Sequence, residues 1–308
     1  MSPDTIRSIA FFGLGNMGLP MARNLLAAGY AIHGYDPVPA AIDASQAGGI
    51  DVAESPAEAT DGVDVVITML PSGRHVLEAY EPGAGIIGTV AENTLVVDCS
   101  TIDIADARAA HEMASEAGLR SLDAPVSGGV VGAKAGTLTF MVGGAVETVA
   151  AAEPVLAAMG KRTVHCGAAG SGQAAKVCNN MILASSMIAV AEAFVLADAL
   201  GLSDQALFDV VSTSSGQCWA ATTNCPVPGP VPTSPANRDF EGGFATALMV
   251  KDLRLAASAA SRGGVDVALG RTALAMYEDL FTSMPDRDFS VVIEAIRWRS
   301  GAREGTTP

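Results

Sequence analysis

A strand, a tight glycine turn and a helix follow one another directly at the start of the chain. Residues 8–12 form a short β-type run, and PMARNLLAAG, which begins at residue 20 after Leu19, has a helical pattern. Between them stands GxGxxG, as Gly13-Leu14-Gly15-Asn16-Met17-Gly18. Glycines in this context let the backbone turn sharply and approach a pyrophosphate, whose charge is met by amide groups at the helix start. The turn is therefore predicted to bind a dinucleotide.

A second strand, predicted over residues 31–35, ends in Asp36. An acidic side chain about 20 residues beyond the glycine turn can hold the two ribose hydroxyls of an adenosine. A carboxylate at this position repels a 2′-phosphate, and the Pro-Val-Pro that follows supplies no arginine to receive one. The pattern predicts NAD, rather than NADP, as the cofactor.

Strand and helix patterns alternate along the first half of the chain. Residues 63–69 and 94–98 read as buried strands, and residues 103–117 read as a helix. Such alternation is typical of a parallel α/β sheet, in which ligands bind beyond the strand ends. Leu70, Pro71 and Thr101 (with Ser100) follow these two strands and are predicted to line the ribose and nicotinamide side of the cofactor site; a purely structural turn is the alternative.

The next strand, predicted over residues 119–122, leads into Asp123-Ala124-Pro125-Val126-Ser127-Gly128-Gly129. Exposed backbone amides at Gly128 and Gly129, together with the Ser127 hydroxyl, would form an uncharged cradle for a substrate carboxylate. A simple tight turn remains the alternative. Residues 136–144 read as a further strand and turn, followed by a helix and a short strand near Val164.

Residues 170–200 read as one long helix that is almost entirely apolar after Met181. We expect this part to be buried on most sides, as a core or subunit-packing helix. A membrane span is disfavoured because the apolar run is shorter than about 20 residues, contains Glu192 and lacks a basic flank. Its first turns differ, since Lys176, Asn179 and Asn180 share one face there.

Helical patterns continue beyond the long helix, over residues 203–211, 244–261, 269–284 and 289–299. The first of them opens with Ser203, which is predicted to cap it. The predicted architecture is therefore α/β: a Rossmann-type doubly wound sheet in residues 1–167, followed by an all-helical substrate and oligomerisation domain in residues 168–308. Helix 170–200 joins the two. Lys251 and Asp252 lie within one of the later helices, where an ion pair and a ligand contact are both consistent with the pattern.

Composition excludes several classes of function. Half of the 308 residues are apolar, 49%, and the net charge of -15 argues against partners such as nucleic acids or anionic membranes. The five cysteines contain no CxxC pair and the histidines show no ligand spacing, so neither disulfides nor a metal site is expected. The first strand begins too early for a signal peptide. We expect a cytoplasmic protein, a homodimer or homotetramer, that acts on a small molecule.

Four segments together resemble the β-hydroxyacid dehydrogenase family along nearly the whole chain. They are FFGLGNMGLPMARNL, DAPVSGGVVGAKAGTLTFMVGG, GSGQAAKVCNNM and KDLRLA. The segments SSGQCW and CPVPG are similar to those of its 3-hydroxyisobutyrate dehydrogenase branch. The resemblance implies Lys176 as the catalytic lysine and Asn180 as its amide partner. It also implies Ser127, Gly128 and Gly129 as the carboxylate cradle, and Lys251 as a second active-site lysine that contacts substrate and cofactor.

Two positions depart from that family pattern. His75 stands where relatives carry asparagine near the cofactor ribose, and Cys225 replaces the asparagine usual before the Pro-Val-Pro-Gly loop. The departures leave open whether His75 contacts the cofactor and what geometry the loop over residues 225–235 adopts.

The implied reaction is reversible oxidation of 3-hydroxyisobutyrate to methylmalonate semialdehyde with NAD, a step of valine catabolism. Lys176 would act as general acid and base if burial lowers its pKa. The main alternative is a sister activity on another β-hydroxy acid, such as tartronate semialdehyde reduction. A lyase that uses Lys176 as a Schiff-base nucleophile and an NAD-binding protein without turnover are two further alternatives.

Overall fold

The computed structural model describes residues 6–83 and 85–301. The chain divides into two compact units, Met1–Lys176 and Val177–Pro308. The expectation of an α/β unit followed by a helical unit is confirmed, while the domain boundary between residues 167 and 168 stays a prediction.

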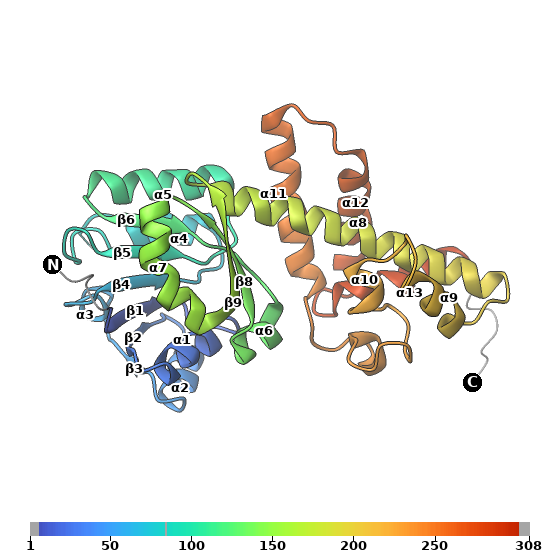
Figure 1. Ribbon diagram of the computed structural model, residues 1–308, viewed down its shortest axis with the longest axis horizontal. Coiled ribbons are helices and arrows are strands. Elements are labelled where there is room, and N and C mark those ends of the chain that lie inside the picture. The colour runs from blue at the N-terminus through green and yellow to red at the C-terminus, as the bar shows by residue number, and fades with distance from the viewer. Residues whose placement is uncertain (1–5, 84, 302–308) are drawn as a thin grey trace. The chain divides into compact units, whose positions relative to one another are not determined.

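The first unit alternates strands and helices as the sequence predicts (Figure 1). In chain order its elements are β1 Ser8–Phe12, α1 Gly18–Ala27, β2 Ala31–Tyr35, α2 Pro39–Gln46, β3 Asp51–Val52, α3 Pro56–Ala59, β4 Val65–Thr68, α4 Gly73–Tyr80, β5 Leu95–Asp98, α5 Ile104–Glu116, β6 Arg120–Asp123, β7 Val126–Ser127, α6 Gly129–Ala135, β8 Leu138–Gly143, α7 Val146–Met159 and β9 Gly160–Gly167.

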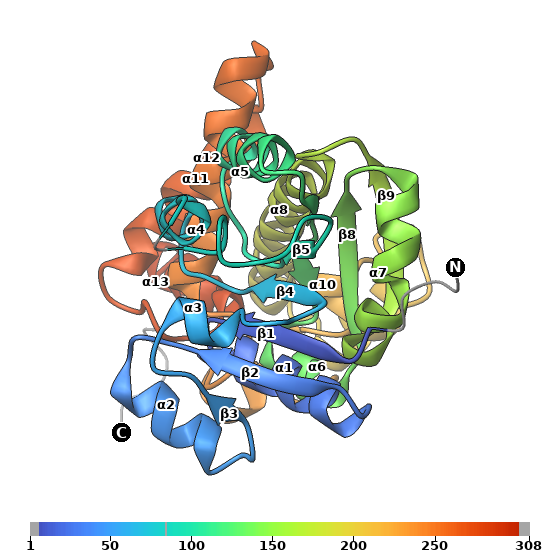
Figure 2. The same cartoon turned by 90° about the vertical axis from the view of Figure 1, so that its left-hand side faces the viewer.

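These strands form one sheet with the order β3-β2-β1-β4-β5-β6-β8-β7, and β9 pairs with β8. Both faces are buried. Ile9 and Phe11 of β1 enter a core shared with α1 and α7, whereas Ala10 and Phe12 enter a second core shared with α4 and α5. Figure 2 shows α4 and α5 on one side of the strands and α1 and α6 on the other. The alternation along β1 thus produces a doubly wound sheet.

The expectation of a parallel sheet is correct for β1 to β6 but wrong at one end. The strands β1 to β6 run parallel, but β8 is antiparallel to β6, which it meets at Asp123, and to β7. A parallel crossover needs a dozen or more residues. Helix α6, with 7 residues, is too short for one, so the chain turns back on itself. As a result, β7 and β8 extend past the carboxyl edge of the parallel strands.

The second unit is helical in its described part. It contains most of α8 Ser171–Ala199, then α9 Asp204–Val211, α10 Trp219–Thr222, η1 Pro235–Arg238, α11 Thr246–Gly263, α12 Ala268–Phe281, η2 Phe289–Val291 and α13 Val292–Arg299. Its core includes the fully buried Tyr277, Phe194 and Phe289. The predicted serine cap of α9 is confirmed, since Ser203 accepts a hydrogen bond from the amide of Ala206.

Helix α8 corrects two expectations about the long apolar segment. It has 29 residues, with an 18-residue window of mean hydropathy 1.8, and so is long and apolar enough to cross a membrane. The length argument against a span is therefore wrong, although 50% of that window is buried inside the protein, as in a core helix. Within the single chain α8 is not buried on most sides, since Ile182 is 64% and Leu196 60% exposed, while the expected role in subunit packing stays a prediction.

Candidate active site

The glycine turn between β1 and α1 is held by close packing at two of its three glycines. Gly13 has a φ of +90°, and a side chain there would collide with the Met69 carbonyl, just as one at Gly18 would collide with the Gly13 carbonyl. A side chain at Gly15 would meet no atom within 4 Å. The turn is therefore open at Gly15, and the predicted pyrophosphate would have space against the backbone there.

Asp36 lies buried at the end of β2, next to this turn. Its carboxylate accepts hydrogen bonds from the amides of Leu14 and Val38, each at 2.8 Å. A carboxylate has about four lone-pair sites, so both oxygens can accept further hydrogen bonds from ribose hydroxyls. The structure thus brings the predicted ribose-binding Asp36 to the predicted pyrophosphate turn.

The ends of β4 and β5 are joined by a hydrogen bond between the segments predicted to line the cofactor site. The amide of Leu70 donates to the Ser100 hydroxyl at 2.8 Å. Pro71 and Thr101 are the next residues of the two segments. Nearby, His75 Nδ1 lies 2.7 Å from the hydroxyl of Ser72 at the start of α4. The structure therefore gives His75 a local partner, and a contact with the cofactor stays open.

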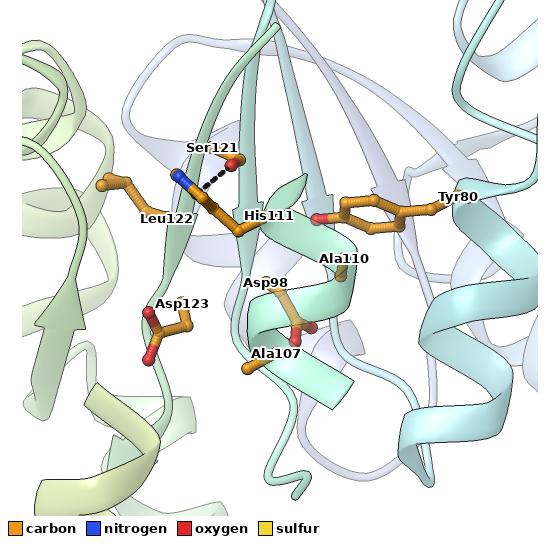
Figure 3. Close-up of a pocket in the computed structure, with 8 residues that line it drawn as sticks. All are labelled: Tyr80, Asp98, Ala107, Ala110, His111, Ser121, Leu122 and Asp123. Atoms are coloured by element: carbon orange, nitrogen blue, oxygen red, sulfur yellow. Dashed lines mark hydrogen bonds between the residues drawn. The ribbon is translucent and has the colours of Figure 1, made fainter. Parts of the chain in front are cut away.

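Asp98 ends β5 with a carboxylate that is fully buried. Its Oδ1 accepts from the Thr68 hydroxyl at 2.8 Å and from the Ser100 amide at 3.1 Å, while Oδ2 has no hydrogen-bond partner among the described residues. Burial, only partly offset by these donors, raises the pKa of Asp98 to about 6. Figure 3 shows Asp98 in a small cavity with Tyr80 and His111.

The predicted carboxylate cradle follows β7. Gly128 and Gly129 have φ values of +136° and +60°, so the backbone conformation alone accounts for glycine at both positions. A side chain at Gly128 would crowd Leu138, but one at Gly129 would meet nothing within 4 Å. The cradle is therefore open at Gly129, beside the partly exposed Ser127.

Lys176 lies on the second turn of α8 and is only 6% exposed. Its Nζ donates to the carbonyl oxygen of Val126 at 2.8 Å. Val126 is the residue before Ser127, so the structure brings the predicted catalytic amine to the predicted carboxylate cradle. Both belong to the first compact unit.

Asn180 lies one helical turn beyond Lys176, in the second unit, where its amide is held by two neighbours. Its Nδ2 donates to the Asp252 carboxylate, and its Oδ1 accepts from Asn179 at 2.9 Å. Asn180 and Asp252 are both buried. Lys251, next to Asp252 on α11, is half-buried. Asp252 therefore orients Asn180, a function that the spacing of residues on α11 did not reveal.

Two further residues of the site region were missed by the sequence patterns. The Asp123 carboxylate accepts from the amides of Gly170 and Gln173 at the start of α8. The Gln173 side chain, fully buried, bonds to the backbone of Ser100 and Ile102. The only available signal was polarity: an aspartate at a strand end and a glutamine among the apolar and small residues of a helix.

Family models cover both units. The model described as the NAD binding domain of 6-phosphogluconate dehydrogenase matches residues 8–167. The model described as the NAD-binding domain of NADP-dependent 3-hydroxyisobutyrate dehydrogenase matches residues 170–296. A probable 3-hydroxyisobutyrate dehydrogenase of Mycobacterium tuberculosis is 53% identical over 295 residues, which is 96% of this chain and 99% of that protein. The chain belongs to the 3-hydroxyisobutyrate dehydrogenase family.

A second relative and a solved structure are similar over nearly the same extent. An NAD-dependent L-serine dehydrogenase of Pseudomonas aeruginosa is 48% identical over 93% of this chain and 97% of its own length. The solved structure of the Mycobacterium tuberculosis 3-hydroxyisobutyrate dehydrogenase with L-serine is 53% identical and has a TM-score of 0.91, covering 95% of this chain and all of that one.

Family membership confirms three predictions. The chain is an oxidoreductase of the 3-hydroxyisobutyrate dehydrogenase family. Its domains bind a nicotinamide dinucleotide, and its substrate is a small hydroxy acid. The open backbone at Gly15 and the Asp36 carboxylate beside it fit such a cofactor.

Proposed function

We propose that this enzyme oxidises 3-hydroxyisobutyrate to methylmalonate semialdehyde, with Lys176 as general base and NAD as hydride acceptor. One observation carries the proposal: the buried Lys176 amine donates to the Val126 carbonyl, adjacent to the Ser127 cradle. The proposed base, Lys176, therefore lies next to the proposed carboxylate-binding turn, within one compact unit. Oxidation of a hydroxy acid requires a base close to the bound substrate.

Each residue has one task in this proposal. The Ser127 hydroxyl and the amides at Gly128 and Gly129 bind the substrate carboxylate and orient its β-carbon. Neutral Lys176 accepts the hydroxyl proton as the C–H bond breaks and the C=O bond forms. Bound NAD supplies the hydride-accepting ring. Asn180, held by Asp252, fixes the angle of the substrate hydroxyl, and Lys251 contacts substrate and cofactor.

NAD is the proposed cofactor because Asp36 is a buried carboxylate at the site of the adenosine ribose. A 2′-phosphate at this position would meet like charge. The cofactor turn over Gly13, Leu14, Gly15, Asn16, Met17 and Gly18, with Leu70, Pro71 and Thr101, completes the proposed set of cofactor residues. NADP should therefore give a lower kcat/KM than NAD.

L-Serine is a second candidate substrate. It is also a β-hydroxy acid, and a relative that is 48% identical is described as an L-serine dehydrogenase. An ammonium group on its α-carbon replaces the methyl group of 3-hydroxyisobutyrate, so the two substrates present the same carboxylate and hydroxyl to the cradle and to Lys176. Reduction of tartronate semialdehyde is a less favoured alternative within the family.

We also propose that the enzyme is a cytoplasmic homodimer or homotetramer. The support for an oligomer is the set of large apolar side chains that unit 177–308 exposes, among them Leu196 in the last turn of α8 and Leu200 directly after the helix. Exposed apolar surface of this kind is typical of subunit interfaces.

The test of the proposed function is turnover by Lys176→Ala. Loss of a general base should lower kcat by about 100-fold or more. NADH formation is followed with 3-hydroxyisobutyrate, L-serine and other β-hydroxy acids, using NAD and NADP. Lys161→Ala, which removes an exposed lysine of β9, is the matched control and should turn over normally. Near-normal turnover by Lys176→Ala would overturn the role of Lys176, and preference for L-serine would replace the proposed substrate.

A further inference from the structure

The start of α8 is capped by a side chain from a distant part of the chain. The first amides of a helix lack partners within the helix. Here the Asp123 carboxylate accepts from the Gly170 amide at 2.7 Å through Oδ1 and from the Gln173 amide at 2.9 Å through Oδ2. Asp123 is the last residue of β6, so these bonds attach the helix to the carboxyl edge of the sheet.

A second attachment joins the same turn to the neighbouring strand end. Gln173 Nε2 donates to the Ser100 carbonyl at 2.7 Å, and the Ile102 amide donates to Gln173 Oε1 at 3.1 Å. Both polar groups of this fully buried amide are therefore used. The turn is attached after β5 as well as at β6, which restricts its rotation and its translation.

A third contact leaves the helix no room to move toward the sheet. A side chain at Gly172 would collide with the Met141 carbonyl of β8 and with Asp123. The helix backbone at Gly172 therefore lies directly against the sheet. The ends of β5 and β6, together with β8 at Met141, thus determine where α8 begins.

Lys176 follows Gln173 on the next turn, and this gives the attachments a role in the reaction. A lysine amine is carried by a flexible four-carbon chain, so its position depends on where the helix places that chain. We infer that Asp123 and Gln173 are positioning residues for Lys176, which hold the first turns of α8 so that the amine reaches the Val126 carbonyl. The inference rests on the proposed role of Lys176 as general base.

Asp123→Asn tests this inference with little change of shape. The amide oxygen can accept from only one of the two helix amides, and its NH₂ group faces the other. A displacement of about 1 Å at a reacting group can cost about 100-fold in rate. We expect kcat to fall by roughly tenfold to 100-fold, with the dissociation constant of NADH unchanged within about twofold.

The decisive measurement is the same change in a Lys176→Ala background, followed as the residual single-turnover rate. If Asp123 acts through Lys176, Asp123→Asn leaves that residual rate unchanged within about twofold, because effects of residues that act as a unit are not additive. Gln173→Met, which keeps the side-chain length and removes both bonds, should give the same non-additive pattern. It provides the test if Asp123→Asn fails to fold.

Asp64→Asn is the matched control. The Asp64 carboxylate also accepts from two backbone amides, of Arg7 at 2.8 Å and Ser8 at 3.0 Å, but it precedes β4 at the opposite end of the strands. Its kcat should stay normal. An unchanged kcat for Asp123→Asn, or an equal loss in the Lys176→Ala background, overturns the positioning role alone. Near-normal turnover by Lys176→Ala itself overturns the proposed function instead.

Discussion

Gly15 and Gly13 belong to one turn but have different physical reasons to be glycine. The backbone at Gly13 has a positive φ, which residues with side chains rarely adopt, and a side chain there would collide with the Met69 carbonyl. A side chain at Gly15 would meet no described protein atom within 4 Å. Gly13 is therefore needed for folding. No described protein atom requires a glycine at position 15, so we expect that a bound ligand does.

Gly15→Ala should therefore separate binding from stability. We expect its free energy of unfolding without ligand to stay within about 0.5 kcal/mol of the wild type, as at other surface positions. Its affinity for NADH should fall by about tenfold or more, because a methyl group would occupy the space of the pyrophosphate. Gly13→Ala is the contrast, and should lose roughly 1–3 kcal/mol through backbone strain. Thermal unfolding measures the stability of each variant, and NADH fluorescence titration measures its affinity. An unchanged affinity in Gly15→Ala would contradict the prediction.

Asp98 makes the stability of the protein depend on pH. Its pKa is about 6 in the folded chain, above the ordinary aspartate value of 3.8 that applies to the unfolded chain. A raised pKa means that the folded state binds the proton more tightly, so the stabilisation is complete below pH 3.8 and is lost as the pH rises through 6. The shift corresponds to about 3 kcal/mol.

Urea unfolding of the wild type and Asp98→Asn between pH 4 and pH 7 tests this dependence. The stability of the wild type relative to Asp98→Asn should decline over this range by up to about 3 kcal/mol. Hydrogen bonds from the Arg7 and Ser8 backbone, among other contacts, lower the pKa of Asp64 below its ordinary value despite its partial burial. The pKa of Asp64 therefore lies below this range, and the stability difference between the wild type and Asp64→Asn should change less over it than the difference for Asp98→Asn. A constant difference for Asp98→Asn would show that Asp98 is already ionised at pH 4.

At the scale of elements, the sequence predicts those features that arise from residues close together in the chain. The strand, glycine turn and helix over residues 8–27, the Asp36 strand end and the Ser203 cap all follow from local patterns, and the structure has them. A strand at β8 was predicted, but its antiparallel direction and the short strand β7 were missed, because the length of α6, which decides that direction, cannot be read from a glycine-rich turn.

The attachments of α8 are equally invisible in the sequence. Asp123 lies 47 and 50 residues before its two amide partners, and Asp252 lies 72 residues after Asn180. Periodicity reports which face of a helix is apolar, but not which distant carboxylate caps it. Lys176 and Ser127 were singled out by chemistry and spacing; the residues that hold them in place required coordinates.

Helix α8 also makes a prediction at the scale of an element. Because Gly172 lies against β8, Gly172→Ala must displace the start of the helix and should cost roughly 1–3 kcal/mol of stability, as other overpacked sites do. Gly263→Ala is the control, since the nearest atom to its added methyl group would lie 3.8 Å away and alanine favours a helix. Chemical denaturation should show loss for the first variant and none for the second; equal stability would contradict the close packing of α8.

At the scale of the whole molecule, the helical unit exposes most of the large apolar side chains that lie on the surface. They include Leu196, Leu200, Leu269 and Trp298. A stable subunit interface buries about 800 Å² on each partner, and apolar side chains dominate its centre. We therefore expect an oligomer because unit 177–308 exposes more large apolar side chains than the first unit does, and a subunit interface would bury them.

Sedimentation velocity at micromolar concentration should show a homodimer or homotetramer. Replacing Leu196 and Leu200 together by lysine should shift the protein toward the monomer, because charges at an apolar interface are costly to bury. Val146→Lys, at an exposed valine of the first unit, should leave the assembly unchanged. A monomeric wild type would show that this surface has another use.

The way α8 is anchored also determines how the protein can be dissected. A chain that stops at residue 167 would lack Gly170 and Gln173, whose backbone amides donate to the Asp123 carboxylate, and would leave that carboxylate without these two hydrogen bonds. The Ser100 carbonyl and the Ile102 amide would also lose their hydrogen bonds to the Gln173 side chain. We therefore expect that a nucleotide-binding fragment must include the first turns of α8 to fold. A fragment that ends with the last strand of the sheet, at Gly167, would be too short.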